Sequence, residues 1–99
     1  MRESDIEKYL CKQVKALDGE VRKVKWIGRA NAPDRLVLIP ESTPYLVELK
    51  RPGEKARPAQ IREHKRLRRC GMQVAVLSTI EDVDGFLWPY HGGYSDDKS

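Results

Sequence analysis

Three residues near the middle of the chain carry side chains that could do chemistry together: Asp34, Glu48 and Lys50. Glu48 and Lys50 lie two positions apart in residues 45–50, a mainly apolar stretch that is typical of a β-strand. Side chains two apart on a strand share a face, so this carboxylate and this amine are predicted to emerge side by side. Charged groups on a buried strand cost free energy unless they are paired or used, which makes the pair a candidate site.

Asp34 begins a second apolar run, which ends at Ile39. Five residues separate this run from residues 45–50, a length that suits a hairpin, so the two strands are predicted to be antiparallel neighbours. The start of one strand then lies beside the end of the other. The spacing therefore predicts that Asp34, Glu48 and Lys50 meet at one end of a hairpin.

This combination of side chains suits the hydrolysis of a phosphodiester, which needs a hydroxide in line and positive charge on the phosphoryl oxygens. Two or three carboxylates bind Mg²⁺ through few protein ligands and leave water molecules to serve as the nucleophile. Lys50 could stabilise the transition-state charge or help to deprotonate that water. The sequence has no Cys/His cluster for a softer metal and no glycine-rich phosphate loop, which disfavours an NTPase.

Length and composition predict one globular domain with a modest core, because the chain has 99 residues, of which 39% are hydrophobic and 34% charged. No apolar run approaches the roughly 20 residues that span a bilayer, and the charged N-terminus does not resemble a signal peptide. Cys11 and Cys70 have no metal-binding spacing and are predicted to remain reduced thiols. We therefore expect an intracellular, cytoplasmic protein.

The formal net charge of +4 is concentrated in one part of the sequence. Residues 50–69 contain nine basic residues against only Glu54 and Glu63. Such a local excess is typical of a surface that binds a polyanion, although a solvated helix face would give the same count. The candidate phosphate contacts are Arg51, Lys55, Arg57, Arg62, Lys65, Arg66 and Arg69.

The remaining segments predict an α/β fold in which a four-stranded mixed sheet is flanked by helices. Apolar residues at helical spacing predict a first helix over residues 3–18, which Gly19 ends. The run 73–78 is nearly all apolar and is therefore predicted to be a central strand. The other predicted elements are strands over 21–27 and 34–39, a helix from Pro58 to about Cys70 followed by Gly71, a short helix over 79–87 with Thr79 as N-cap, and a loosely held tail over 88–99 that follows a domain of residues 1–87.

Two of these helices carry polar residues toward the body of the protein. In the first, Glu3 and Glu7 lie at or beside the apolar stripe, and the favourable effect of an acid on the helix dipole is an alternative explanation for Glu3. In the second, Gln60 and His64 share a face opposite the basic residues. We interpret His64 as a hydrogen-bonded, half-buried histidine in preference to a metal ligand.

Four motifs in order resemble the PD-(D/E)xK nuclease superfamily and, more narrowly, its small stand-alone VRR-Nuc (virus-type replication-repair nuclease) domains from phages. They are Ser4-Asp5-Ile6-Glu7, Pro33-Asp34-Arg35-Leu36-Val37, Glu48-Leu49-Lys50-Arg51-Pro52-Gly53 and Pro58-Ala59-Gln60. The resemblance runs from about Glu3 to Leu87 and implies a restriction-endonuclease-like core. The family often has glycine where this chain has Asn31, a residue that also tolerates a positive φ.

The resemblance implies a role for each motif. Asp34 and Glu48 would bind Mg²⁺ or Mn²⁺, and Lys50 would lie beside the attacking water. The acid from the first helix would be Glu7, with Glu3 as the alternative, because both fit the pattern of a glutamate followed three positions later by an apolar residue. Gln60 would support the site.

The resemblance also implies what the protein acts on and with. It implies an endonuclease for branched DNA, similar to Holliday-junction resolvases, that forms a homodimer and works in a phage or its bacterial host beside a helicase or another replication-repair protein. The alternatives are a flap or nicking nuclease and a DNA-binding module that does not cut. The intact Asp34, Glu48 and Lys50 disfavour the last of these. A sequence-specific restriction-type enzyme is disfavoured because 99 residues leave little surface for reading bases.

Overall fold

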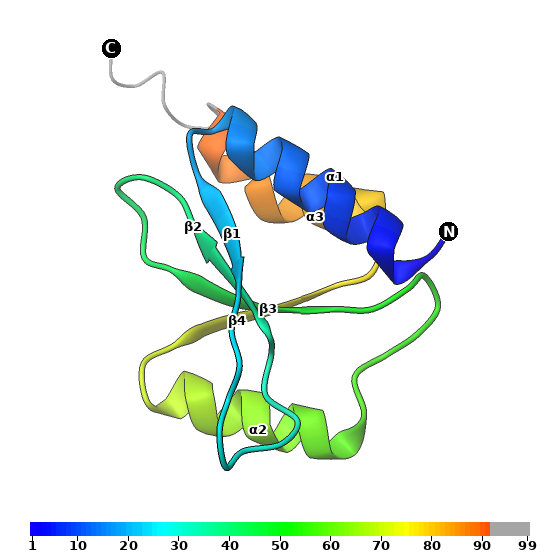
Figure 1. Ribbon diagram of the computed structural model, residues 1–99, viewed down its shortest axis with the longest axis vertical. Helices are drawn as coiled ribbons and strands as arrows, with labels where there is room; N and C mark the ends of the chain where they lie inside the picture. The colour runs from blue at the N-terminus through cyan, green and yellow to red at the C-terminus, as the bar shows by residue number, and fades with distance from the viewer. Residues whose placement is uncertain (92–99) are drawn as a thin grey trace.

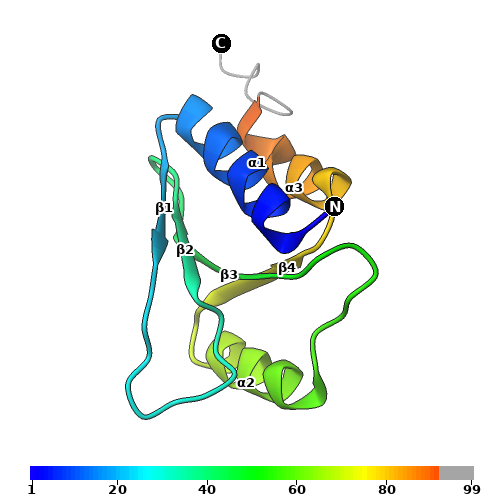
Figure 2. The same ribbon diagram turned by 45° about the vertical axis from the view of Figure 1, so that its right-hand side comes forward.

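Two helices cover one face of a four-stranded sheet and a third helix covers the other face (Figure 1). This computed structural model describes residues 1–91. Figure 2 shows α1 and α3 side by side on one side of the sheet, with α2 alone on the opposite side. The elements in chain order are α1 (Glu3–Ala16), β1 (Glu20–Lys23), β2 (Arg35–Leu38), β3 (Tyr45–Leu49), α2 (Pro58–Arg69), β4 (Gln73–Leu77), α3 (Ile80–Leu87) and the 3₁₀ helix η1 (Trp88–His91).

The sheet is mixed, as the sequence predicts. Its strands lie in the order β1-β2-β3-β4, with β1, β2 and β3 antiparallel in turn and β3 parallel to β4. The parallel pair is joined through α2, which is long enough to carry the chain back across one face of the sheet. The predicted α/β class is thereby confirmed.

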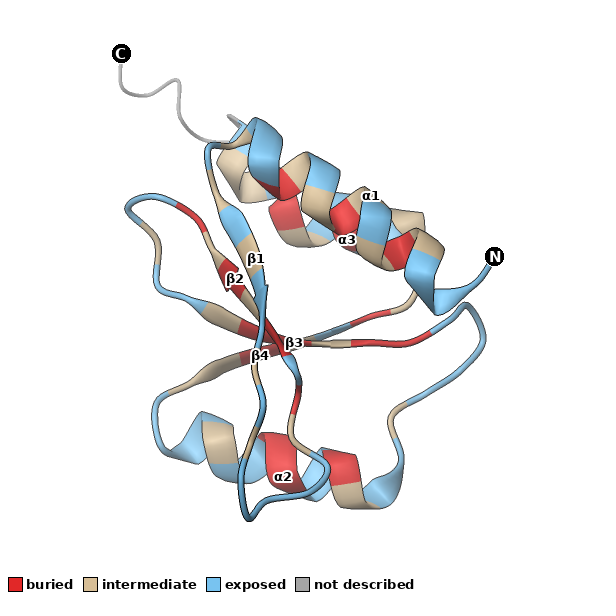
Figure 3. Ribbon diagram, viewed as in Figure 1, coloured by how far each residue is buried: buried red, intermediate tan, exposed pale blue. Residues whose placement is uncertain are grey.

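The core lies between the sheet and the pair α1 and α3. The apolar stripe predicted for the first helix supplies Ile6, Leu10 and Val14, which are fully buried. They pack with inward side chains of β3 and α3, such as Val47 and Val83 (Figure 3). The burial of these side chains fixes α1 on the sheet and so fixes where its acidic residues lie.

The first helix ends two residues earlier than predicted, at Ala16. Asp18, not Gly19, takes the left-handed conformation after the helix, with φ of 62°. The N–H groups of both residues donate to carbonyl groups of the last turn. Gly19 is required for a different reason: a Cβ atom there would lie 2.4 Å from the carbonyl oxygen of Leu38.

The second helix ends as the sequence predicts, with Gly71 just beyond it at φ +96°. The N–H of Gly71 donates to the carbonyl of Arg68 at 3.0 Å, and the N–H of Met72 donates to that of Leu67 at 3.0 Å. This pair of hydrogen bonds is a Schellman motif. It turns the chain directly from α2 into β4.

The prediction that residues 73–78 form a central strand is wrong, because β4 is an edge strand of the sheet. Its apolar character has another cause, since α2 packs against one face of β4, where Val74 is buried, and the core lies on the other face, where Leu77 is buried, while Val76 stays 37% exposed. The guanidinium of Arg68 donates to the carbonyl oxygen of Val74 at 2.9 Å. The composition of a strand depends on the burial of its two faces and not on its position in the sheet. An edge strand that is covered by helices can therefore be as apolar as a central strand.

Two other predicted boundaries also differ. The strand predicted over residues 21–27 is shorter and begins one residue earlier, as β1 (Glu20–Lys23). The tail predicted over 88–99 begins with an ordered turn, because Trp88–His91 forms η1. Tyr90 packs against the core, and its hydroxyl lies 2.9 Å from that of Ser42. The rest of the predicted tail, residues 92–99, lies outside the described residues.

The predictions about cysteines and membranes can be compared with residues 1–91. Both cysteines are free thiols, half-buried at Cys11 and exposed at Cys70. Within the same part of the chain, no helix combines the length and the apolar character that crossing a membrane would require.

Candidate active site

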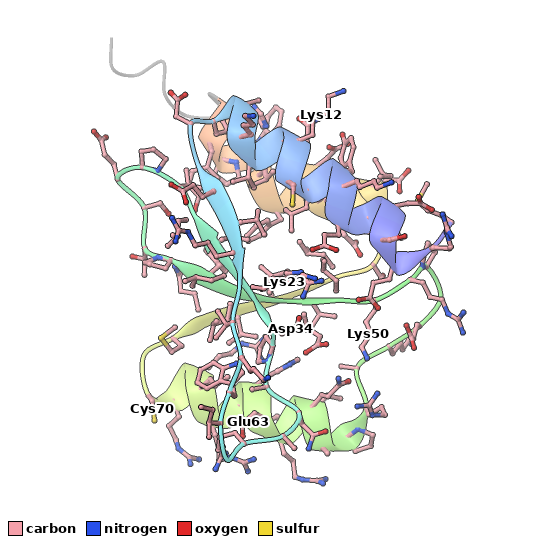
Figure 4. The ribbon with its side chains drawn as sticks, viewed as in Figure 1. Lys12, Lys23, Asp34, Lys50, Glu63 and Cys70 are labelled. Carbon is pink, nitrogen blue, oxygen red and sulfur yellow. The ribbon has the colours of Figure 1, made fainter. Side chains whose placement is uncertain are left out.

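The hairpin of β2 and β3 brings together the carboxylates that the sequence singled out. Arg35 pairs with Val47 in the antiparallel register. Continued by one residue, that register sets Asp34 opposite Glu48, and residues directly opposite each other share a face of the sheet. Lys50, two residues after Glu48, is on the same face. Figure 4 shows Asp34 and Lys50 on the side of the sheet that faces α2.

Glu48 sits in a dry environment between β3 and α2, with a side chain that is only 12% exposed. The amide Nε2 of Gln60 lies 3.4 Å from its Oε2 and donates to it. Its other oxygen, Oε1, is buried without a hydrogen-bond partner among the described residues. The Nε2 of His64 lies 3.6 Å from that oxygen and equally has no hydrogen-bond partner among the described residues.

Burial raises the pKa of Glu48 to about 7. The negative charges of Asp34 and Glu3 raise the pKa further, whereas the positive charges of Lys50 and Arg57 oppose the rise. Carboxyl groups with a pKa this high are concentrated at functional sites, because a structural carboxylate is normally solvated or paired.

Burial also lowers the pKa of His64, and the positive charge of Arg68 lowers it further. The imidazole is therefore neutral at physiological pH, and its contact with Glu48 is not an ion pair. The prediction of a half-buried, hydrogen-bonded histidine differs from the structure, because His64 is fully buried and its Nε2 has no hydrogen-bond partner among the described residues.

Gln60 joins the start of α2 to the site. Its side-chain oxygen accepts a hydrogen bond of 2.9 Å from the N–H of Arg57, the residue just before the helix, and its amide nitrogen donates to Glu48. One side chain thus caps the helix and orients the carboxylate. Gln60 and His64 are four residues apart, so they lie on the same face of α2, and this face packs toward the sheet, as the helical spacing in the sequence predicts.

Lys50 is almost fully buried, with 5% of its surface exposed. Its main-chain N–H donates to the carbonyl of Leu77 at 3.0 Å, which extends the pairing of β3 with β4 by one step. This bond fixes the backbone that carries the amine. A buried lysine whose charge acts on Glu48 must be compensated or used.

Asp34 is oriented from the other face of the sheet by Arg35. The guanidinium of Arg35 pairs with two carboxylates, those of Asp34 and Glu7. Its Nη1 lies 2.8 Å from Oδ1 of Asp34, and its Nε lies 2.7 Å from Oε2 of Glu7. Arg35 is itself buried, so these are strong charge-assisted hydrogen bonds. The pKa of Glu7 is lowered by its hydrogen bond to Arg35.

The two acidic residues of α1 therefore lie in different surroundings. Glu7 contacts Arg35. Glu3 is exposed in the first turn of α1, close enough to Glu48 for its charge to raise the pKa of that residue. Sequence spacing alone could not separate the two, because each begins the same pattern of a glutamate followed by an apolar residue three positions later.

The described residues offer an incomplete metal site. Within residues 1–91, no three or more His, Cys, Asp and Glu side chains are grouped closely enough to hold a metal ion. The same residues enclose no pocket. Asp34 and Glu48 provide hard oxygen donors, and the unpartnered Oε1 of Glu48 is free to accept a cation.

The predicted phosphate contacts are all exposed, but they fall into two groups. Arg51, Lys55 and Arg57 lie in the connection between β3 and α2, beside the site, since the charge of Arg57 acts on Glu48. The second group lies on the outer face of α2, away from the sheet, and consists of Arg62, Lys65, Arg66 and Arg69. The first group therefore includes a charge that acts on the site.

Sequence reasoning assigned no role to Arg35 and Glu63. Arg35 shares the core face of β2 with Val37, and a basic residue there implies a buried acid as partner, which was the available signal. Glu63 is buried on α2 and accepts hydrogen bonds from Arg29 and Arg66. Its partner Arg29 lies 34 positions away, in a loop, and no spacing rule would have found it.

Comparison with known proteins gives consistent matches. The sequence pattern of a family described as the VRR-NUC domain matches residues 3–79. A phage protein named "Putative nuclease p44", from Acyrthosiphon pisum secondary endosymbiont phage 1, is 44% identical over 87 residues, which cover 88% of this chain and 92% of that protein.

A solved structure of a VRR-NUC domain has the same fold. Its TM-score to this structure is 0.79 at 38% sequence identity, and the match covers 89% of this chain and 96% of the other. The residues that match the family pattern include β2, β3 and α2, the elements beside or on which Asp34, Glu48 and Gln60 lie.

Proposed function

The chain belongs to the VRR-NUC domain family of nucleases, and on that premise we propose that it is a divalent-metal-dependent endonuclease that hydrolyses phosphodiester bonds in branched DNA. The observation that carries the proposal is the β2–β3 register, which sets Asp34 opposite Glu48 with Lys50 on the same face. A buried amine that shares a face of the sheet with two carboxylates is a suitable arrangement for phosphoryl chemistry.

The donor set fits a hard divalent cation. Asp34 and Glu48 repel each other, and Glu48 has an unpartnered oxygen, so a cation between them would relieve both costs. A bound Mg²⁺ or Mn²⁺ would supply a hydroxide nucleophile near neutral pH and positive charge for the phosphoryl oxygens. Few protein ligands are needed, because Mg²⁺ retains several waters.

The chain's own residues then have distinct roles. Gln60 holds one oxygen of Glu48, so the other oxygen is presented to the cation. Arg35 holds one oxygen of Asp34 in the same way. Lys50 donates to the non-bridging oxygens of the phosphate as negative charge develops there, in a site where burial strengthens the interaction.

A third acid from α1 would complete the site, and Glu3 is supported over Glu7. The charge of Glu3 acts on Glu48, whereas one oxygen of Glu7 is taken by Arg35. A side chain in the first turn of a helix can turn toward the site without breaking an existing ion pair. Glu7 would then not bind the cation. It would hold Arg35 in place, and Arg35 in turn orients Asp34.

Branched DNA as substrate, the homodimer and a helicase or another replication-repair protein as partner are supported by family membership. The exposed basic residues in the connection between β3 and α2, such as Arg51 and Lys55, suit a polyanion. The alternatives are a flap or nicking nuclease with the same site, and a DNA-binding module that does not cut.

One assay tests the function. Purified protein is incubated with linear duplex, nicked duplex, flap and four-way-junction DNA, each with Mg²⁺, with Mn²⁺ or with EDTA. We expect paired cuts in the junction with either metal, none with EDTA, and little cleavage of linear duplex. Asp34→Asn, purified in parallel, controls for contaminating nucleases.

Each other pattern identifies an alternative. Cleavage confined to flap or nicked DNA would assign one of those activities. Metal-independent binding with no cleavage of any substrate would assign the non-catalytic module. Cleavage by Asp34→Asn at the wild-type rate would show that the site lies elsewhere.

A further inference from the structure

The loop between β1 and β2, residues 24–34, extends the antiparallel pair that these two strands form. The N–H of Val24 donates to the carbonyl of Asp34 at 2.9 Å, which continues the ladder of the two strands. One step further, the indole Nε1 of Trp26 donates to the carbonyl of Pro33 at 2.8 Å. The two arms of the loop are therefore tied together from the site outward.

The far part of the loop is tied to α2. Arg29 forms an ion pair with Glu63, whose side chain is 3% exposed and also accepts from Arg66 at 2.7 Å. The two guanidinium groups lower the pKa of Glu63, so the pair persists at all physiological pH values. Figure 1 and Figure 2 both show the loop reaching past the sheet to α2. Gly28 and Asn31, at φ 80° and 68°, shape its tip.

This anchored loop holds Ile27 away from the protein. Ile27 is 94% exposed, more than any other large hydrophobic residue among residues 1–91. The next are Met1 at 69%, close to the chain end, and Trp88 at 64%. In Figure 3 the loop around it is exposed along most of its length. The anchors on both sides prevent Ile27 from turning inward, so its exposure is built into the loop.

The charges around Ile27 point to a polyanion as its partner. Residues 21–33 contain four basic residues, Arg22, Lys23, Lys25 and Arg29, and no acidic residue. Arg22 pairs with Glu20 and Arg29 with Glu63, so the positive charge near Ile27 that has no ion pair among the described residues comes from Lys23 and Lys25. An apolar side chain near such charge suits a ligand with an anionic backbone and an apolar interior. Nucleic acid has both, and proteins that bend or open DNA insert apolar side chains between its base steps.

We propose that Ile27 is a wedge that inserts between base pairs at the branch point of DNA bound in the active site. The proposal rests on the proposed nuclease function and deepens it, because it assigns the recognition of the branch to a residue. Base pairs at a branch have lost a stacking neighbour, so insertion there costs less than in continuous duplex. The wedge would therefore select branched DNA without reading its sequence.

The geometry also predicts where the DNA is cut. Val24 lies level with Asp34, and Ile27 follows three residues later in the anchored loop. A wedge held at a fixed place relative to the site should put the cut at one fixed distance from the branch point.

The test compares Ile27→Ser with a matched control, Ile61→Ser, which removes a 42%-exposed isoleucine from α2. A four-way junction carries 2-aminopurine at the branch point, and its fluorescence reports unstacking when protein binds in EDTA. Wild type and Ile61→Ser should raise the fluorescence several-fold, whereas Ile27→Ser should lose most of the rise. With Mg²⁺, Ile27→Ser should show about tenfold less preference for junction over nicked duplex and cuts at scattered positions.

The outcomes separate this inference from the proposed function. A fluorescence rise with wild type but no cleavage of any DNA would support the wedge and overturn the nuclease. Cleavage by wild type with an equal fluorescence response from Ile27→Ser would overturn the wedge alone. Loss of the dimer in Ile27→Ser, measured by sedimentation, would also overturn it and make the loop tip a contact between subunits.

Discussion

Glu48 and His64 face each other at 3.6 Å, and neither of the two facing atoms has a hydrogen-bond partner among the described residues. Both groups are neutral over part of the physiological range, because burial raises the pKa of Glu48 to about 7 and lowers that of His64. The pair therefore does not attract by charge. The Oε1 of Glu48 is thus buried without a hydrogen bond. This burial lowers the stability of the fold when no cation is bound, and a bound cation would remove the cost.

The pH dependence of stability should report this cost. The pKa of Glu48 is raised from 4.5 to about 7, so the folded state binds a proton more tightly than the unfolded state between these values. The metal-free protein should lose up to about 3 kcal/mol of unfolding free energy as pH rises through this window, with no further loss above it. Urea unfolding from pH 4.5 to 8.5 in EDTA measures the effect.

Glu48→Gln is the control for that experiment. It should remove the loss, so the variant is more stable than wild type at pH 8 and similar to it at pH 4.5. Excess Mg²⁺ should restore the stability of wild type at pH 8 and leave the variant unchanged. A wild-type profile that is flat from pH 5 to 8 would show that Glu48 titrates normally.

Loss of any of the three central side chains should abolish cleavage while DNA binding remains. Asp34→Asn and Glu48→Gln remove cation ligands, and Lys50→Ala removes the charge that faces the phosphate. We expect cleavage to fall by at least about 1000-fold in each. Binding to junction DNA in EDTA should stay the same or tighten in the two carboxylate variants, since each removes negative charge near the phosphates. Parallel loss of binding would indicate misfolding.

The two acids of α1 should behave differently. Glu3→Gln should weaken metal activation, raising the Mg²⁺ concentration needed for half-maximal cleavage with little effect on thermal stability. Glu7→Gln should destabilise the fold by about 2 kcal/mol, because it leaves the buried guanidinium of Arg35 without its strongest partner. Titrations of Mg²⁺ and thermal melts of both variants distinguish these effects. Equal metal dependence in the two variants would argue against Glu3.

The outer face of α2 should bind phosphates through charge alone. Neutralising Arg62, Lys65 and Arg69 to Gln should weaken binding to all DNA sequences alike. It should also reduce the slope of log K against log salt by about one unit for each phosphate that is no longer neutralised. Arg66 serves as the matched control, because its pairing with Glu63 leaves less free charge, so Arg66→Gln should change the slope least. A triple variant with an unchanged slope would make this face an ordinary solvated surface.

Assembly is testable by mass. Two symmetric cuts in a junction need two sites, and one domain of 99 residues offers a single one. A two-fold dimer supplies both, and a core this small gains from burying further surface. Sedimentation or light scattering at micromolar protein should give twice the monomer mass of 11.4 kDa. A strict monomer that makes both cuts would contradict this, and one that makes a single cut would favour nicking.

The sequence predicted those parts of the site that depend on the spacing of residues within one strand, hairpin or helix. Hairpin length and strand alternation placed Asp34 near Glu48, and helical spacing turned Gln60 toward the sheet. It could not predict that Arg35 links Glu7 to Asp34, because that link depends on how α1 packs across β2.

Strand order escaped prediction for a similar reason. The apolar run of β4 indicates that both faces are covered, but not whether a fifth strand lies beside it. The cover comes from α2 and from α1 with α3, which pack on opposite faces of the sheet. Helix packing across a sheet is a tertiary property that local composition does not record.

The parallel pairing of β3 with β4 has a consequence for the order of folding during synthesis. Glu48 pairs with Val76, and the N–H of Lys50 donates to Leu77, so the strand that carries two site residues has one partner near in sequence and one distant partner. The β2–β3 hairpin can form as soon as it leaves the ribosome. The pairing of β3 with β4 can form only after α2 and β4 have been translated. The nascent nuclease should thus remain inactive until nearly the whole domain has emerged.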